Sequence, residues 1–195
     1  MPVLTHPLPD VTAANASEIL ATHWGIHGIL RPLPGERERN FHVYTADGRE
    51  FVLKVASPLE DAGAIDLQVA ALAHIADKLP SAPVPRLVPS TEGSRVVHQV
   101  IGGELHAARL LTWLPGQPMA EVSPHSPALL RAVGGSLGAV TGGLASFEHP
   151  AARRGLKWDL AASDWIADHV HRVTAGLRRA EVEKILPKGR DAKPA

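Results

Sequence analysis

The stretch EFVLKVASPLEDAGAIDLQ, residues 50–68, places one lysine in a run of alternating apolar residues and then enters a helix. Side chains of a strand alternate between its two faces, so Leu53 and Lys54 are expected on opposite faces. The following Ser57-Pro58-Leu59-Glu60 has the pattern of an N-cap, a proline at the first helical position and a glutamate at N3. The stretch therefore predicts a strand that leads directly into a helix, with one cation beside the turn.

A short helix and two more strands are predicted before this stretch. Asn15 and Glu18 have the spacing of a capping box, and the helix that they start is expected over about 16–24, ending at Gly25. Asp47-Gly48 is a strong hairpin signal. The three predicted strands of this region are 26–33, 40–45 and 50–55.

The helix after the lysine carries an inward-facing polar side chain. Residues 64–79 repeat apolar residues at helical spacing, and Gly63 is expected to interrupt the first turn. At about 100° per residue, Gln68 lies within the apolar stripe, whereas Asp66 and Glu60 lie outside it. Two further strands follow a proline-rich break, at about 95–101 and 105–112, joined through Gly102-Gly103.

The sequence after LPGQP, residues 114–118, is predicted to be helical. One apolar stripe runs from Leu129 to Phe147. Ser163 is expected to cap another helix. The inward residues of that helix are expected to be Ile166, Val170, Val173 and Leu177. The last residues, 187–195, lack apolar periodicity and are predicted to be disordered.

Composition excludes several classes of function. Twenty basic residues balance twenty acidic ones among 195, so no overall field attracts nucleic acid or an anionic membrane. There is no cysteine, which excludes disulfides and thiolate chemistry. No leader and no apolar run of about 20 residues is present, which predicts a cytoplasmic protein.

The eleven histidines do not predict a metal site. His169 and His171 are grouped with Asp164 and Asp168 on one predicted helix. Residues two apart lie about 200° apart around a helix, so the two imidazoles cannot bind the same metal ion there. We therefore interpret this group as solvated helix surface, with no metal ligands.

The order of these elements resembles the nucleotide-binding lobe of a protein-kinase-like fold. The chain is similar to the aminoglycoside phosphotransferase and choline kinase-like family, and most of all to its hydroxylysine kinase-like branch. The stretches that carry the resemblance, over about residues 20–187, are LPGERERNFHVYTADGREFVLKVA, LQVAALAHI, VPR, RLLTWLPG and FEHPAARRGLKWDL.

This resemblance implies an α+β fold with two parts and a tail. Residues 1–113 would form a nucleotide-binding lobe with a five-stranded antiparallel sheet and a helix. Residues 114–186 would form the first helices of an incomplete helical C-lobe, followed by the tail at 187–195. In some long relatives such a region precedes a class III aminotransferase domain.

The resemblance also assigns expected roles to residues near the lysine. Lys54 would hold the α- and β-phosphates of ATP, although on spacing alone it could be a solvent-facing lysine of an edge strand. The backbone amides of the turn Gly35-Glu36-Arg37-Glu38 would cover the phosphates, and Asn40 would anchor the second strand; a charged hairpin loop is the alternative for this turn. Gln68 takes the place of the usual glutamate partner of the lysine, with Asp66 the nearest acid; a buried amide bonded to backbone is the alternative for Gln68. The backbone of the connector would bind adenine through Thr112, Trp113 and Leu114.

The sequence lacks the residues that perform catalysis in this family. The family uses His-x-Asp followed by Asn, and then a metal-binding Asp, to accept the substrate proton and hold Mg²⁺. No such pattern follows residue 113, so we expect this chain to contain no catalytic residue and no metal ligand. Asp191 is not part of a His-x-Asp pattern. We expect a truncated, frameshifted or misannotated reading frame, with ATP and Mg²⁺ used by the full-length parent.

Two hypotheses follow. The first is the amino-terminal portion of an ATP-dependent small-molecule kinase that phosphorylates a hydroxyl of an amino-acid-like or amino-alcohol substrate. The second is a non-catalytic nucleotide-binding or interaction module that keeps Lys54 without chemistry. Neither involves nucleic acid or a membrane.

Overall fold

The computed structural model describes residues 8–153, 160–174 and 176–191. The chain divides into two compact units, one of residues 4–152 and one of residues 153–195 with 1–3. The first unit contains the sheet and the predicted nucleotide-binding residues, and it continues past the boundary at residue 113 that the resemblance implies. That boundary stays a prediction.

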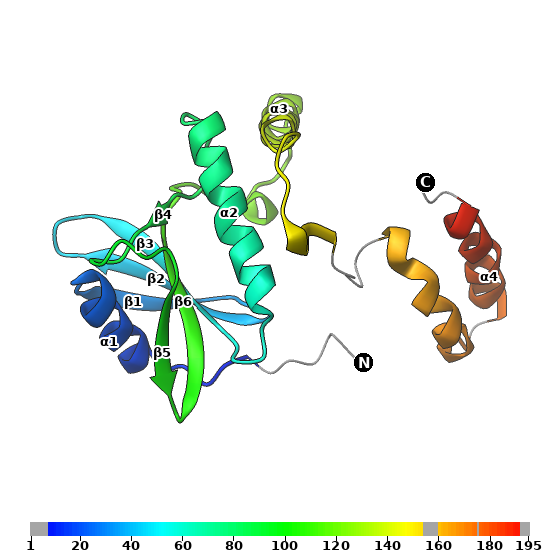
Figure 1. Cartoon of the computed structure of the whole chain (residues 1–195). Coiled ribbons are helices and arrows are strands. Elements are labelled where there is room, and N and C mark those ends of the chain that lie inside the picture. Colours follow the sequence, from blue (N-terminus) through cyan, green and yellow to red (C-terminus); the bar gives the residue numbers. More distant parts are fainter. Residues whose placement is uncertain (1–7, 154–159, 175, 192–195) are drawn as a thin grey trace. The chain divides into compact units, whose positions relative to one another are not determined.

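One antiparallel sheet organises the first unit (Figure 1). Its strands are β1 (Gly28–Leu33), β2 (Glu38–Thr45), β3 (Glu50–Ala56), β4 (Leu87–Val88), β5 (Val97–Ile101) and β6 (Glu104–Thr112). The order is β1-β2-β3-β6-β4, and β5 also pairs with β6. The α+β class is confirmed, but the sheet has six strands rather than five. The missed strand, β4, has only two residues, too few for an alternating pattern to show.

Helix α1 (Ala13–Trp24) covers one face of the sheet. Its N-cap is Thr12, and Asn15 is the N3 residue whose side chain bonds back to the cap. The prediction that Asn15 is the N-cap was therefore wrong by three residues, because the hydroxyl of Thr12 caps the helix instead. The helix ends at Gly25, as predicted, in the left-handed conformation with φ 62°. The buried core between α1 and the sheet includes Ile19, Leu20, Phe41, Val43, Leu53, Val55 and Leu110.

Helix α2 (Ala62–Lys78) lies on the opposite side of the sheet from α1 (Figure 1). Its N-cap is Asp61, whose carboxylate accepts hydrogen bonds from the amides of Gly63 and Ala64 at 3.3 and 3.1 Å. The prediction of a cap at Ser57 was wrong, since a carboxylate four residues later caps the helix. Gly63 accordingly belongs to the first turn and does not interrupt it.

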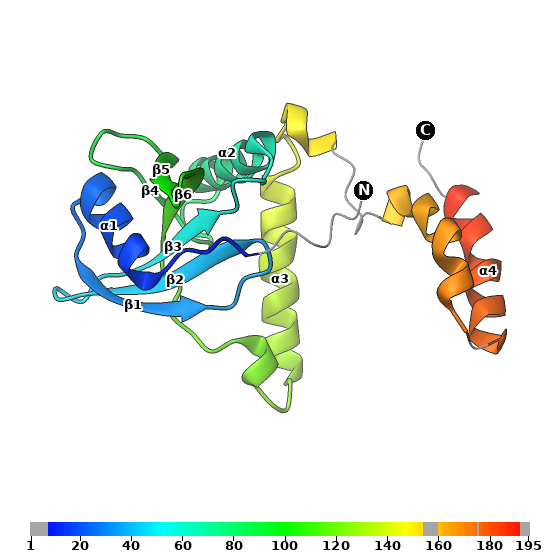
Figure 2. The ribbon, with the colours of Figure 1, turned by 90° about the horizontal axis from the view of Figure 1, so that it is seen from below.

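Helix α3 (Pro127–Gly143) follows the 3₁₀ turn η1 (Met119–Glu121), and Ser126 caps it. The end of α3 lies beside α2 (Figure 2), where His74 Nε2 is 3.0 Å from the carbonyl oxygen of Gly143. Leu130 and Leu137 of α3 are 51% and 63% exposed. The predicted apolar stripe is helical only as far as Gly143, because Leu144 is the C-cap and Phe147 lies beyond the helix. Part of the stripe on α3 is uncovered. A further 3₁₀ turn, η2 (Pro150–Arg153), follows.

The second unit contains the 3₁₀ helix η3 (Leu160–Arg172) and helix α4 (Gly176–Asp191). Ser163 falls inside η3 rather than at the start of an α-helix, which corrects the predicted cap. Of the predicted inward residues, Val170 is buried, and the side chain of Leu177 lies outside those described. Residues 187–191 are helical where disorder was predicted, and 192–195 lie outside the described residues. No described helix is long and apolar enough to cross a membrane.

Candidate functional site

Strand register gathers the polar residues of the site on the face that α2 covers. Lys54 of β3 is the register partner of Asn40 on β2 and of Arg109 on β6. Leu53, one residue earlier, is fully buried in the core beneath α1. The predicted separation of Leu53 and Lys54 onto opposite faces is therefore confirmed.

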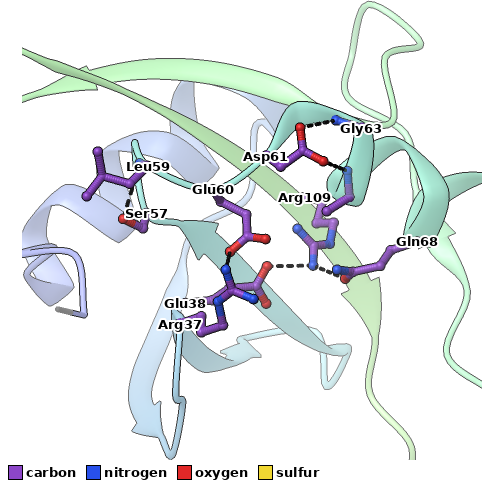
Figure 3. A network of polar contacts seen from close by, with 10 residues as sticks. Arg37, Glu38, Ser57, Leu59, Glu60, Asp61, Gly63, Gln68 and Arg109 are labelled. Carbon is purple, nitrogen blue, oxygen red and sulfur yellow. Dashed lines mark hydrogen bonds and ion pairs between the residues drawn. The ribbon is translucent and has the colours of Figure 1, made fainter. Parts of the chain in front are cut away.

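A carboxylate of β2 lies between two cations. Glu38 Oε2 is 2.8 Å from Lys54 Nζ, and Glu38 Oε1 is 2.6 Å from Arg109 Nη2. The same Arg109 nitrogen donates to Gln68 Oε1 of α2 at 2.6 Å (Figure 3). We call Glu38, Lys54, Gln68 and Arg109 the Glu38 cluster. With two cations, one anion and one amide, its formal charge is positive.

The structure corrects the expected partner of Lys54. Gln68 points inward as predicted, but it contacts Arg109 and not the lysine. Asp66 is on the exposed side of α2, with its side chain 74% exposed, and pairs with His149 Nε2 at 3.0 Å. Helix α2 therefore supplies no acid to Lys54, and the carboxylate comes from β2. The spacing of residues does not predict Glu38 as the partner of Lys54. Periodicity shows which face of an element a residue lies on, but not which neighbouring strand faces it.

Burial and charge act in opposite directions on Glu38. Its burial raises the pKa, while the charge of Arg109 and the hydrogen bond and charge of Lys54 lower it. The two cations outweigh burial, so the pKa of Glu38 is lowered below its ordinary value. A lowered pKa in the folded state means that ionised Glu38 stabilises the fold.

This shift predicts acid sensitivity. The stabilisation is present above the unfolded pKa of glutamate, about 4.3, and is lost as pH falls through the lower folded value. We expect the free energy of unfolding to decrease as pH falls below about 4.3, and Glu38→Gln to remove part of that slope. Urea denaturation at a series of pH values measures it. Glu36→Gln, on an exposed neighbour, is the control; equal slopes in Glu38→Gln and wild type would contradict the assignment.

The turn before β2 is closed tightly. Asn40 Nδ2 donates to the carbonyl oxygen of Pro34 at 3.0 Å. A side chain at Gly35 would collide with the carbonyl oxygen of Glu38, so the turn requires glycine there. Arg37 pairs with Glu60 Oε2 at 3.3 Å and ties the turn to the segment before α2 (Figure 3). Gly35 and Asn40 are thus predicted from the sequence, whereas the Arg37–Glu60 pair is not.

Much of the hydrogen bonding at the end of β6 is already used. Thr112 donates its amide to the carbonyl of Arg86 at 2.8 Å, and its hydroxyl accepts from the Arg86 amide at 2.9 Å. The Trp113 amide donates to the carbonyl of Glu50 at 3.2 Å. Leu114 follows after the strand has ended and is 41% exposed. Of the three amides, those of Thr112 and Trp113 are committed to the fold.

An aromatic stack adjoins this strand end. The Trp113 ring stacks on His42 with centroids 3.5 Å apart and planes 15° apart. His42 Nε2 is 2.7 Å from Glu50 Oε2. No periodic pattern predicts this stack, because the register of β2, β3 and β6 brings the residues together.

The arrangement fits an anion better than a metal ion. The Glu38 cluster offers the partly exposed ammonium group of Lys54, a group that binds phosphate oxygens, whereas the guanidinium of Arg109 is buried. Within residues 8–153, 160–174 and 176–191, no three His, Cys, Asp or Glu side chains are gathered as a metal site requires. The Glu38 cluster is thus a cationic group of side chains, with one carboxylate between two cations.

Comparisons with known proteins find relatives in sequence and in fold. Two curated relatives are the hydroxylysine kinases of Danio rerio and Bos taurus. The first is 26% identical over 199 residues, which cover 92% of this chain and 55% of the relative. The second is 30% identical over 196 residues, which cover 91% and 51%. The chain thus spans about half the length of the curated relatives it matches.

Two solved structures share the fold. A microcompartment-associated aminopropanol kinase has a TM-score of 0.58 at 18% identity, over 75% of this chain and 45% of its own. The amicoumacin kinase hAmiN, in complex with AMP-PNP, Ca²⁺ and Ami, has a TM-score of 0.64 at 14% identity, over 90% and 54%. The sequence profile of the phosphotransferase enzyme family matches residues 29–192. With its kinase-like sheet and this match over most of its length, the chain belongs to the phosphotransferase enzyme family.

Proposed function

We propose that the chain is the nucleotide-binding portion of an ATP-dependent small-molecule kinase of the hydroxylysine kinase type. The parent protein would transfer the γ-phosphoryl of ATP to a hydroxyl of an amino-acid-like or amino-alcohol substrate. The observation that carries this proposal is Lys54, an ion-paired and partly exposed cation beside a glycine turn in a kinase-like sheet. The two hydroxylysine kinase relatives support the substrate class.

Each residue near Lys54 would have a separate task. Lys54 would bind the α- and β-phosphates, since its side chain is 28% exposed and its ammonium is already oriented. The Gly35 turn, held by Asn40, would present backbone amides to the phosphates. The connector at Thr112, Trp113 and Leu114 would bind adenine. Because two of its amides are committed, we assign the donor role to the Leu114 amide.

Mg²⁺ would be used by the parent protein, where it neutralises charge on the transferring phosphoryl group. The described residues of this chain would contribute the cation and the backbone amides, and the metal ligands would come from the parent protein. Cytoplasmic location, and fusion to an aminotransferase domain in longer relatives, stay predictions from the sequence.

A second candidate is a non-catalytic nucleotide-binding module. The supporting observation is that residues 114–195 contain no asparagine and no His-x-Asp pattern. Such a module would bind ATP through Lys54 and transfer nothing. The two candidates share the binding step and differ only in chemistry.

ATP binding tests the shared step. Lys54→Ala is expected to weaken ATP binding about 10- to 150-fold, because a charge-assisted hydrogen bond contributes about 1.5–3 kcal/mol. Isothermal titration calorimetry on the 195-residue chain measures the Kd. Lys78→Ala, which removes an exposed lysine from the last turn of α2, is the matched control. Equal affinity in Lys54→Ala and wild type would refute the proposed role of Lys54.

A further inference from the structure

The two cations of the Glu38 cluster differ in their freedom to move. Arg109 is 1% exposed and is bonded on two sides, to Glu38 of β2 and Gln68 of α2, each at 2.6 Å. The Lys54 side chain is 28% exposed and pairs with Glu38 at 2.8 Å. A ligand in solvent can therefore reach the lysine, whereas the arginine is fixed in the interior.

The shared carboxylate makes the ion pair of Lys54 exchangeable. If Lys54 turned toward a phosphate, Glu38 would keep its contact with Arg109. Without Arg109 the same movement would leave a mostly buried carboxylate with no partner, which is strongly unfavourable. The Glu38 side chain is only 13% exposed, so water cannot easily replace the lost cation.

The amide of Gln68 keeps the cluster positive. It accepts a hydrogen bond from Arg109 without adding a negative charge. Arg109 Nη1 is buried and has no hydrogen-bond partner among the described residues. The guanidinium is thus not saturated by its neighbours, and one carboxylate must serve both cations.

We propose that Arg109 is a positioning residue for nucleotide binding: it holds the Glu38 carboxylate, so that Lys54 can exchange this carboxylate for a phosphate of ATP. This inference rests on the proposed function and extends it to a residue that does not touch the nucleotide. Helix α2 acts on the lysine through Gln68, Arg109 and Glu38 in turn. The lysine thereby has a partner that stays satisfied when the nucleotide binds.

Two substitutions of one residue separate this role from a structural one. Gln68→Glu keeps the shape and the hydrogen bond to Arg109 but adds a carboxylate that competes for its charge. We expect about a tenfold weaker ATP affinity, because Glu38 then depends more on Lys54. Gln68→Met removes the hydrogen bond and adds no charge, and we expect less than a threefold change. A purely structural Gln68 predicts the opposite ranking, with Gln68→Met the weaker binder.

A double-mutant cycle gives an independent test. Arg109→Met is expected to weaken ATP binding about tenfold, and adding Glu38→Gln is expected to restore the affinity to within about threefold of wild type. The rescue follows because Lys54 then has no anion to leave behind. Losses that add up in the double variant would overturn the proposal.

The measurement is calorimetric ATP binding to the 195-residue chain, with the folded fraction of each variant checked by circular dichroism. If Arg109→Met lowers the folded fraction, the ATP affinities of Gln68→Glu and Gln68→Met decide whether Arg109 is a positioning residue. A wild-type chain that binds no ATP refutes the proposed function and this inference together. Lys54-dependent ATP binding with Gln68→Glu at or above wild-type affinity refutes the role of Arg109 alone.

Discussion

Leu53→Ala is expected to lower the free energy of unfolding of the sheet unit by about 2–5 kcal/mol. Leu53 is 0% exposed, and it lies in the core where α1 packs on the central strands. Removing its buried methyl groups costs their transfer free energy and leaves a cavity that a close-packed core fills only in part. Domains are stable by only about 5–15 kcal/mol, so this loss is a large share of the total.

Urea denaturation followed by circular dichroism measures the change, and Ile29→Ala is the matched control. Ile29 is also an apolar strand residue, but it is 69% exposed, and its truncation is expected to change stability by less than about 0.5 kcal/mol. A loss below about 1 kcal/mol for Leu53→Ala would contradict the assignment of this core.

The same variant also tests the two-faced character of β3. Leu53 points to α1 and Lys54 to the face of α2, so a truncated Leu53 should leave the ATP affinity of the folded protein close to wild type. Lys54→Ala should do the reverse, weakening ATP binding with little loss of stability. If both variants lost affinity equally, the two faces would not be independent.

The face of each side chain could be predicted from the sequence because strand and helix periods are local. Alternation placed Leu53 and Lys54 correctly, and the helical stripe placed Gln68 inward. The partners could not be predicted, because they depend on register between strands far apart in the chain. Arg109 is 71 residues from Glu38 and 41 from Gln68, so no spacing rule connects them.

The errors at helix starts have a local cause. Thr12 and Asp61 cap α1 and α2, but Asn15 and Ser57 are also good capping residues. Where two such residues lie three or four positions apart, sequence alone does not decide which one takes the cap. Arg109 could not be predicted for a different reason. In the sequence it is one residue of an otherwise apolar strand, and its role follows only from its ion pair with Glu38 of another strand.

Phosphoryl transfer is the step that we expect to be missing from the 195-residue chain. With ATP, Mg²⁺ and hydroxylysine, the chain is expected to form ADP at least about 10²- to 10⁴-fold more slowly than a full-length hydroxylysine kinase, because a positioned general base contributes that factor. The absence of metal ligands would lower the rate of ADP formation further, because no metal ion would neutralise the charge on the transferring phosphoryl group. Residues 114–195 contain no His-x-Asp pattern followed by Asn, which is why we expect these roles to be unfilled.

A coupled assay for ADP, run with and without hydroxylysine, measures the transfer, and Lys54→Ala is the background control. ATP binding without hydroxylysine-dependent ADP formation would match both candidate functions for this chain. Appending, in the same reading frame, the region of a hydroxylysine kinase relative that this chain does not cover then separates them. Recovered transfer supports the kinase portion, and no transfer supports the non-catalytic module. Hydroxylysine-dependent ADP formation by the 195-residue chain, abolished in Lys54→Ala, would contradict the prediction and place the catalytic base among its own residues.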